Sequence, residues 1–92
     1  MKFEWDEKKN LDNIKKHGFS FEESITVFKD TKSVVLYDED NSDDEDRFNI
    51  IGMSQLSNLL IVCHSYRESD TVIRIISART PEKDEIALYE EY

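Results

Sequence analysis

Several arginines stand inside or at the ends of apolar segments in the second half of the chain. Arg47 precedes Phe48–Met53, Arg74 lies within Val72–Ile76, and Arg79 follows the same apolar stretch. An arginine in such a segment must project from the less buried face, pair with an acid, or bind an anion. A structural ion pair is the ordinary explanation, so the spacing indicates a candidate anion site without establishing one.

The histidines and the cysteine have simpler explanations. His64 lies in an apolar segment, where a half-buried, hydrogen-bonded role is more common than catalysis. His17 ends a predicted helix, where a positive charge suits the helix dipole. Cys63 is typical of a small core residue, and the chain has no second cysteine with which to form a disulfide. The sequence shows no zinc-type Cys/His spacing, phosphate loop or nucleophile elbow, and it predicts neither a metal site nor a cofactor.

Charge is distributed unevenly along the chain. The net charge is −9, and such an excess of acid argues against nucleic-acid binding because phosphate contacts need Lys and Arg. Seven of the 21 acids, however, lie in Asp38–Asp46, and five more follow Thr80. The rest of the chain holds 11 basic and 9 acidic residues. A locally basic surface can therefore coexist with an acidic total.

The run Asp38–Asp46 could suggest a calcium-binding loop. It lacks the central glycine and the closing glutamate of an EF-hand loop. A solvated hairpin loop is the simpler interpretation. A metal-binding acidic module would instead predict calcium-dependent stabilisation of the fold.

Two helices are predicted to precede the strands. The first runs from Glu7 to His17, between an Asp6 N-cap and the stop signal Gly18. The second spans Phe21–Phe28 and begins at the capping box of Ser20 and Glu23. The first helix has two predicted faces, an apolar one with Leu11 and Ile14 and an opposite polar one with Lys9, Asn13 and Lys16.

Strands are predicted on both sides of this helical pair. Phe3–Trp5 forms a short first strand, and four later segments rich in Val, Ile and Tyr have short connections typical of antiparallel hairpins. Thr80 and Pro81 predict the start of a closing helix, with Ile86 and Tyr89 packing on the sheet. The four later strands are Ser33–Tyr37, Arg47–Met53, Leu59–Tyr66 and Thr71–Ala78. This order predicts an α+β domain in which two helices lie on one side of a four-stranded meander.

Length and hydropathy indicate a single cytoplasmic domain covering residues 1–92. No apolar run approaches the roughly 20 residues of a membrane span. The N-terminus is charged and lacks the apolar core of a signal peptide. We therefore expect no membrane association.

Several short segments, taken in order, resemble the BrnT family of toxins. Each is weak alone, but the ordered set spans nearly the whole chain. The segments are Phe3–Asp6, Lys9, Asn13, Lys16–Phe19, Phe21–Glu23, Arg47–Ser54, Arg74–Arg79, and Glu85 with Tyr89. The resemblance implies a RelE-like fold and a toxin of a type II toxin–antitoxin system that inhibits translation through metal-independent endoribonuclease cleavage of RNA.

The resemblance also implies partners. A BrnA-like antitoxin, similar to ribbon-helix-helix DNA-binding proteins, would neutralise the toxin. The two proteins would form an oligomeric complex that represses its own operon. Operator DNA would be contacted only through that complex.

Site roles follow from the resemblance residue by residue. Arg47, Arg74 and Arg79 would contact phosphate and the transition state, and His17 would be a further catalytic candidate. Metal-free RNA cleavage needs a base for the 2′-hydroxyl proton, cations for the phosphorane charge, and an acid for the departing 5′-oxygen. The implied RNA-binding residues are Lys9, Asn13, Lys16 and Trp5, although a core role explains Trp5 equally well.

The acidic run is a departure from what an RNA-cleaving toxin needs, because it directly precedes Arg47. It could point away and leave activity intact. Alternatively, the chain could be a weakened or inactive ribonuclease retained for antitoxin binding and operon control. Arginines that converge with Lys9 and Lys16 on one concave surface would favour catalysis, whereas scattered arginines paired with carboxylates would favour a binding module.

Overall fold

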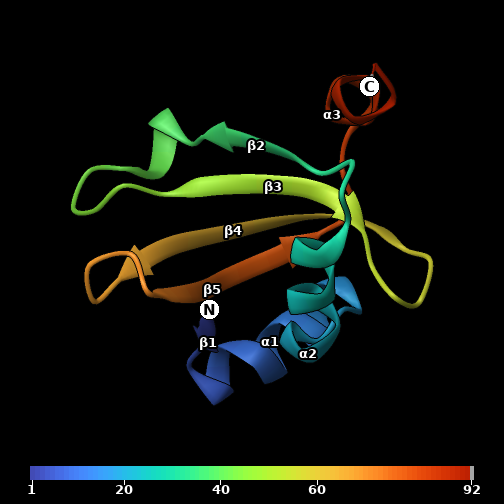
Figure 1. Cartoon of the computed structure of the whole chain (residues 1–92). Coiled ribbons are helices and arrows are strands. Elements are labelled where there is room, and N and C mark those ends of the chain that lie inside the picture. Colours follow the sequence, from blue (N-terminus) through green and yellow to red (C-terminus); the bar gives the residue numbers. More distant parts are fainter. Residues whose placement is uncertain (92) are drawn as a thin grey trace.

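A five-stranded mixed sheet organises the chain (Figure 1). The computed structural model describes residues 1–91, and its strand order is β1-β5-β4-β3-β2. The α+β class and the antiparallel meander are confirmed. The meander consists of β2 (Val34–Tyr37), β3 (Phe48–Met53), β4 (Leu59–Arg67) and β5 (Val72–Arg79).

The short first strand joins this same sheet. β1 (Lys2–Glu4) pairs in parallel with β5, and its last residue, Glu4, lies opposite Arg74. The second half of β5 therefore has no strand neighbour on that edge. The sequence predicted the strand but not its place in the sheet, because a three-residue segment carries no pairing information.

Helices cover one face of the sheet and enclose the core (Figure 1). α1 (Glu7–His17) begins at Asp6, whose side chain accepts from the Lys8 backbone N–H, and ends at Gly18 with a φ of 83°. α2 (Phe21–Ser24) continues directly as the 3-10 helix η1 (Ile25–Lys29), so the predicted second helix changes its winding partway. The buried core comprises Phe21, Val27, Ile50, Leu60, Val62, Ile73, Ile75 and Ala78.

The two predicted faces of α1 do not match the observed burial. Asn13 is only 6% exposed, whereas Leu11 is 60% exposed and Ile14 41% exposed. The Asn13 side-chain amide donates to the Ala78 carbonyl (3.0 Å) and accepts from the Ala78 N–H (3.1 Å). Asn13 thus takes the place of the missing strand neighbour beside the second half of β5. Periodicity alone assigned asparagine to solvent because it could not register this open edge.

The closing helix lies on the opposite side of the sheet from α1 and α2 (Figure 1). α3 spans Lys83–Glu90, with Glu82 as its N-cap, so the predicted start at Thr80 and Pro81 is two residues too early. The Glu85 side chain accepts from the Glu82 N–H at 2.8 Å and completes a capping box. Within residues 1–91, no helix combines the length and apolar character needed to cross a membrane.

Candidate anion-binding site on the open sheet face

The sheet face turned away from α1 and α2, here called the open face, carries the three predicted arginines. Successive strand residues point to opposite faces. His64 and Ile75 lie on the helix-covered side, against Phe28 and in the core respectively. Their neighbours Ser65 and Arg74, which are cross-strand partners, therefore project from the open face.

Arg47 and Arg79 line one polar cavity of about 360 Å³ on this open face. Cys63 and Ser77, which are cross-strand partners, lie beside them, and Glu85 of α3 lines another side. The two arginines could bind an anion, but carboxylates line the same cavity. Its geometry brings together two arginines separated by 32 residues in sequence, which spacing alone could not establish.

The loop Asp38–Asp46, here called the acidic loop, borders the same cavity. Asp38, Asp40 and Asn41 are among the lining residues. The loop is anchored at its base because Asp38 N–H donates to the Arg47 carbonyl (2.9 Å) and Arg47 N–H donates to the Ser42 hydroxyl (3.0 Å). The hypothesis that the loop points away from the arginines is therefore wrong for this part of it, and its charge opposes an approaching polyanion.

Glu85 fixes the position of Arg79. Nη1 and Nη2 of Arg79 donate to the two carboxylate oxygens at 2.8 and 3.0 Å, which is the bidentate geometry preferred by this pair. The hydrogen bonds raise the pKa of Arg79 and lower the pKa of Glu85. Sequence reasoning placed Glu85 in the family pattern but missed this contact, which only the tertiary fold creates.

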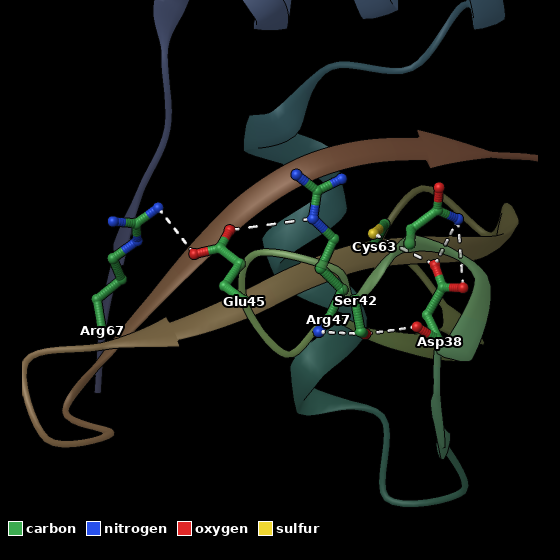
Figure 2. Close-up of polar contacts among 7 residues, drawn as sticks. Asp38, Ser42, Glu45, Arg47, Cys63 and Arg67 are labelled. Carbon is green, nitrogen blue, oxygen red and sulfur yellow. Dashed lines mark hydrogen bonds and ion pairs between the residues drawn. The ribbon is translucent and has the colours of Figure 1, made fainter.

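Arg47 has a weaker partner. Its Nε lies 3.9 Å from Glu45 of the acidic loop, and the same carboxylate lies 3.2 Å from Nη2 of Arg67 (Figure 2). Among the described residues, Arg47 Nε is one of the buried side-chain atoms with no hydrogen-bond partner. Arg67 was not predicted as a site residue, since it closes a strand next to a turn and resembles an ordinary surface cation.

Arg74 projects from the open face but does not line the cavity. Its Nη1 donates to Glu4 of the neighbouring β1 strand at 2.8 Å. Two of the three predicted arginines share one cavity, as expected for a catalytic site. Each of the three also lies close to a carboxylate, as expected for a binding module.

The basic residues of α1 border a smaller cavity of about 200 Å³. Lys9, Lys16 and His17 line it, and Ser77 lines both this cavity and the arginine cavity. The two surfaces are therefore continuous along the edge of β5. Asn13 also borders the smaller cavity, but its amide is committed to Ala78 and to the Phe19 carbonyl.

Trp5 is half-buried at the edge of the core. Its ring meets Phe21 edge-on at 6.2 Å, and its indole N–H donates to the Glu7 carboxylate at 3.2 Å. Both its apolar face and its donor are thus occupied within the chain.

His64 and Cys63 differ in part from the roles expected from sequence. His64 is fully rather than half buried, and its Nε2 has no hydrogen-bond partner among the described residues. Cys63 is a partly exposed residue that lines the arginine cavity rather than a core residue. His64 is fully buried on the helix-covered side against Phe28 and Tyr66, and burial lowers its pKa. Burial raises the pKa of the Cys63 thiol to about 11, so Cys63 lies beside the arginines as a neutral thiol. In the part of the chain that the structure describes, no three His, Cys, Asp or Glu side chains are grouped as metal ligands.

The fold and the cavity together define a small α+β protein that presents an arginine-containing polar cavity on the open face of a mixed sheet. Comparison with known proteins identifies its family. The chain belongs to the family described as the ribonuclease toxin, BrnT, of type II toxin–antitoxin systems, whose model matches residues 5–85. This confirms the resemblance inferred from the ordered motifs, and membership in a type II system implies an antitoxin as partner.

A solved structure supports the same relationship. The chain is similar to the crystal structure of the Brucella abortus ribonuclease toxin BrnT, with 25% sequence identity and a TM-score of 0.67. The match covers 90% of this chain and 99% of the Brucella chain. No curated protein matches the chain.

Proposed function

We propose that this chain is a metal-independent endoribonuclease that acts in the cytoplasm and inhibits translation by cleaving RNA. The observation that carries the proposal is the shared cavity of Arg47 and Arg79 on the open face. Guanidinium groups match phosphate oxygens in shape and charge. The adjoining surface of Lys9, Lys16 and His17 supplies further cations along the path of an RNA backbone.

In this proposal, Arg79 stabilises the charge that develops on the phosphorane, since Glu85 holds its guanidinium in one orientation. Arg47 contacts a neighbouring phosphate oxygen, and Arg74 contacts the backbone further along the open face. His17 transfers a proton, because its ring lines the surface that Ser77 joins to the arginine cavity and an imidazole has both a donor and an acceptor nitrogen. In this proposal Asn13, whose amide is bonded to Ala78, holds α1 against β5, and Trp5, whose indole N–H donates to Glu7, packs at the edge of the core against Phe21.

Family membership implies an antitoxin, and its type and its contact with DNA are part of this proposal. The antitoxin is of the ribbon-helix-helix type, and the oligomeric toxin–antitoxin complex binds operator DNA through the antitoxin alone. The net charge of −9 supports this division of roles, because a protein so acidic is a poor partner for duplex DNA by itself.

A second candidate function is a binding module without catalytic activity. The ion pairs of Arg47, Arg74 and Arg79, together with the acidic loop beside the cavity, favour this alternative. Such a chain would bind the antitoxin and serve operon control while cleaving no RNA.

Expression of the chain alone in bacteria distinguishes the two. Wild-type protein is compared with Arg79→Ala, and Lys15→Ala is the matched control because Lys15 is an exposed α1 cation outside the cavities. Growth arrest with RNA degradation that persists in Lys15→Ala and disappears in Arg79→Ala is the expected result, and addition of EDTA should leave cleavage by purified protein unchanged. Normal growth and intact RNA with soluble, folded wild-type protein would support the binding module.

A further inference from the structure

Glu45 lies between two guanidinium groups at the border of the open face (Figure 2). Its Oε1 is 3.9 Å from Arg47 Nε, and its Oε2 is 3.2 Å from Arg67 Nη2. The three side chains come from the acidic loop, the start of β3 and the end of β4. One carboxylate is thus shared by two arginines that have no other acidic partner among the described residues.

Two buried polar atoms lie close to this arrangement without a hydrogen-bond partner. They are Arg47 Nε and Ser65 Oγ, and the Ser65 residue is only 1% exposed. The two residues are neighbours, because Phe48 pairs with His64 in antiparallel register, and this sets the preceding residue Arg47 across from Ser65. A buried donor without an acceptor costs free energy, and native proteins rarely leave two such groups side by side.

The Glu45 carboxylate does not satisfy these groups. At 3.9 Å its oxygen attracts Arg47 Nε electrostatically but is too distant for a hydrogen bond. A phosphodiester carries the same single negative charge on two free oxygens, and it can accept from guanidinium and hydroxyl donors at once. The donor set therefore fits a phosphate better than the acid that now faces it.

We infer that Arg47, Arg67 and Ser65 form a second RNA-phosphate subsite, next to the Arg79 cavity, and that the Glu45 carboxylate stands in for the phosphate in the free protein. The inference rests on the proposed function, since it extends the RNA path away from Arg79 toward the end of β4. RNA binding requires that the Glu45 side chain swing aside and that the buried donor atoms of Arg47 and Ser65 become accessible. The base of the acidic loop stays closed through Asp38 and Ser42.

The test measures binding separately from cleavage. A fluorescent 2′-O-methyl RNA oligonucleotide has no free 2′-hydroxyl to react, so anisotropy reports affinity alone. Glu45→Gln should bind it about three- to fivefold more tightly than wild type, which is the range expected for one partly exposed ion pair. Asp44→Asn is the control, because it removes the same charge from an exposed loop residue that forms no ion pair in the described chain.

Arg67→Gln should weaken RNA binding. The slope of log affinity against log salt concentration should become less steep by about 0.7, which is the value for one phosphate contact on a single strand. Combining Ser65→Ala with Glu45→Gln should remove part of the increase in RNA affinity that Glu45→Gln produces. Circular dichroism confirms that each variant is folded before its affinity is interpreted.

Equal tightening by Glu45→Gln and Asp44→Asn, or an unchanged salt slope in Arg67→Gln, would overturn the subsite. If these variants behave as expected but no variant cleaves unmodified RNA, the subsite stands and the ribonuclease proposal fails. If wild type cleaves RNA and Glu45→Gln matches Asp44→Asn, the ribonuclease proposal stands and the subsite fails.

Discussion

The Arg79 guanidinium faces the Glu85 carboxylate in a bidentate pair of 2.8 and 3.0 Å, and the same carboxylate caps α3 through the Glu82 N–H. One side chain therefore joins the end of β5 to the first turn of the last helix. This relationship places an arginine in the cavity and also holds α3 over the open face, so its disruption has two measurable consequences.

Glu85→Ala should lower the free energy of unfolding by about 1 to 2 kcal/mol, because it removes both a helix cap and a partly exposed ion pair. Urea denaturation followed by circular dichroism measures the change. Glu90→Ala serves as control, since Glu90 is an exposed residue of the same helix. Equal stability of the two variants would contradict a structural role for the Glu85 contacts.

Asn13→Ala should destabilise the fold by about 2 kcal/mol, because the buried N–H and carbonyl of Ala78 lose their partner. Amide exchange at Ala78 should accelerate more than at the neighbouring core strands. Asp12→Ala, at an exposed position of the same helix, is the matched control. If Asn13→Ala weakened RNA binding without altering stability, Asn13 would belong to the RNA surface after all.

His64 should make stability depend on pH. Burial lowers its pKa from the ordinary value of 6.5, so the unfolded chain binds this proton more readily than the folded chain. The contribution of neutral His64 is fully present above pH 6.5 and is lost as the pH falls below that value toward the folded pKa. Unfolding free energies measured between pH 7.5 and 5, at intervals of about half a unit, should decline on the acid side.

The His64→Phe variant isolates this pH effect. Phenylalanine retains an aromatic ring against Phe28 and Tyr66 but cannot be protonated, so the decline should flatten. Gln55→Ala is the control, because Gln55 is exposed and has no titratable side chain, and it should keep the wild-type slope. An unchanged slope in His64→Phe would assign the pH dependence to other groups.

Cys63 should react slowly with thiol reagents in the folded protein. Its pKa of about 11, caused chiefly by burial and then by the nearby Asp38 charge, leaves little thiolate at pH 8. Labelling with a disulfide reagent should be at least about tenfold faster in denaturant, where the thiol regains its ordinary pKa near 8.5. Comparable rates in the folded and denatured states would show that the thiol is more exposed or more ionised than its surroundings suggest.

Local sequence signals determined most of the secondary structure. Asp6 and Gly18 mark the ends of α1 because a cap side chain and a left-handed glycine act within a few residues. The meander was predictable because β-branched segments with short connections favour antiparallel neighbours. The family was recognisable from the order of its motifs, and the family model confirms it over residues 5–85.

The tertiary structure decided where those elements meet. Asn13 became a substitute strand neighbour only because β1 ends opposite Arg74, which no periodicity records. The partners of Arg79 and Arg47, Glu85 and Glu45, likewise depend on how α3 and the acidic loop return to the open face. Sequence patterns report the spacing of side chains along one element, whereas ion pairs and shared cavities depend on distances between elements, which arise only when the sheet is assembled.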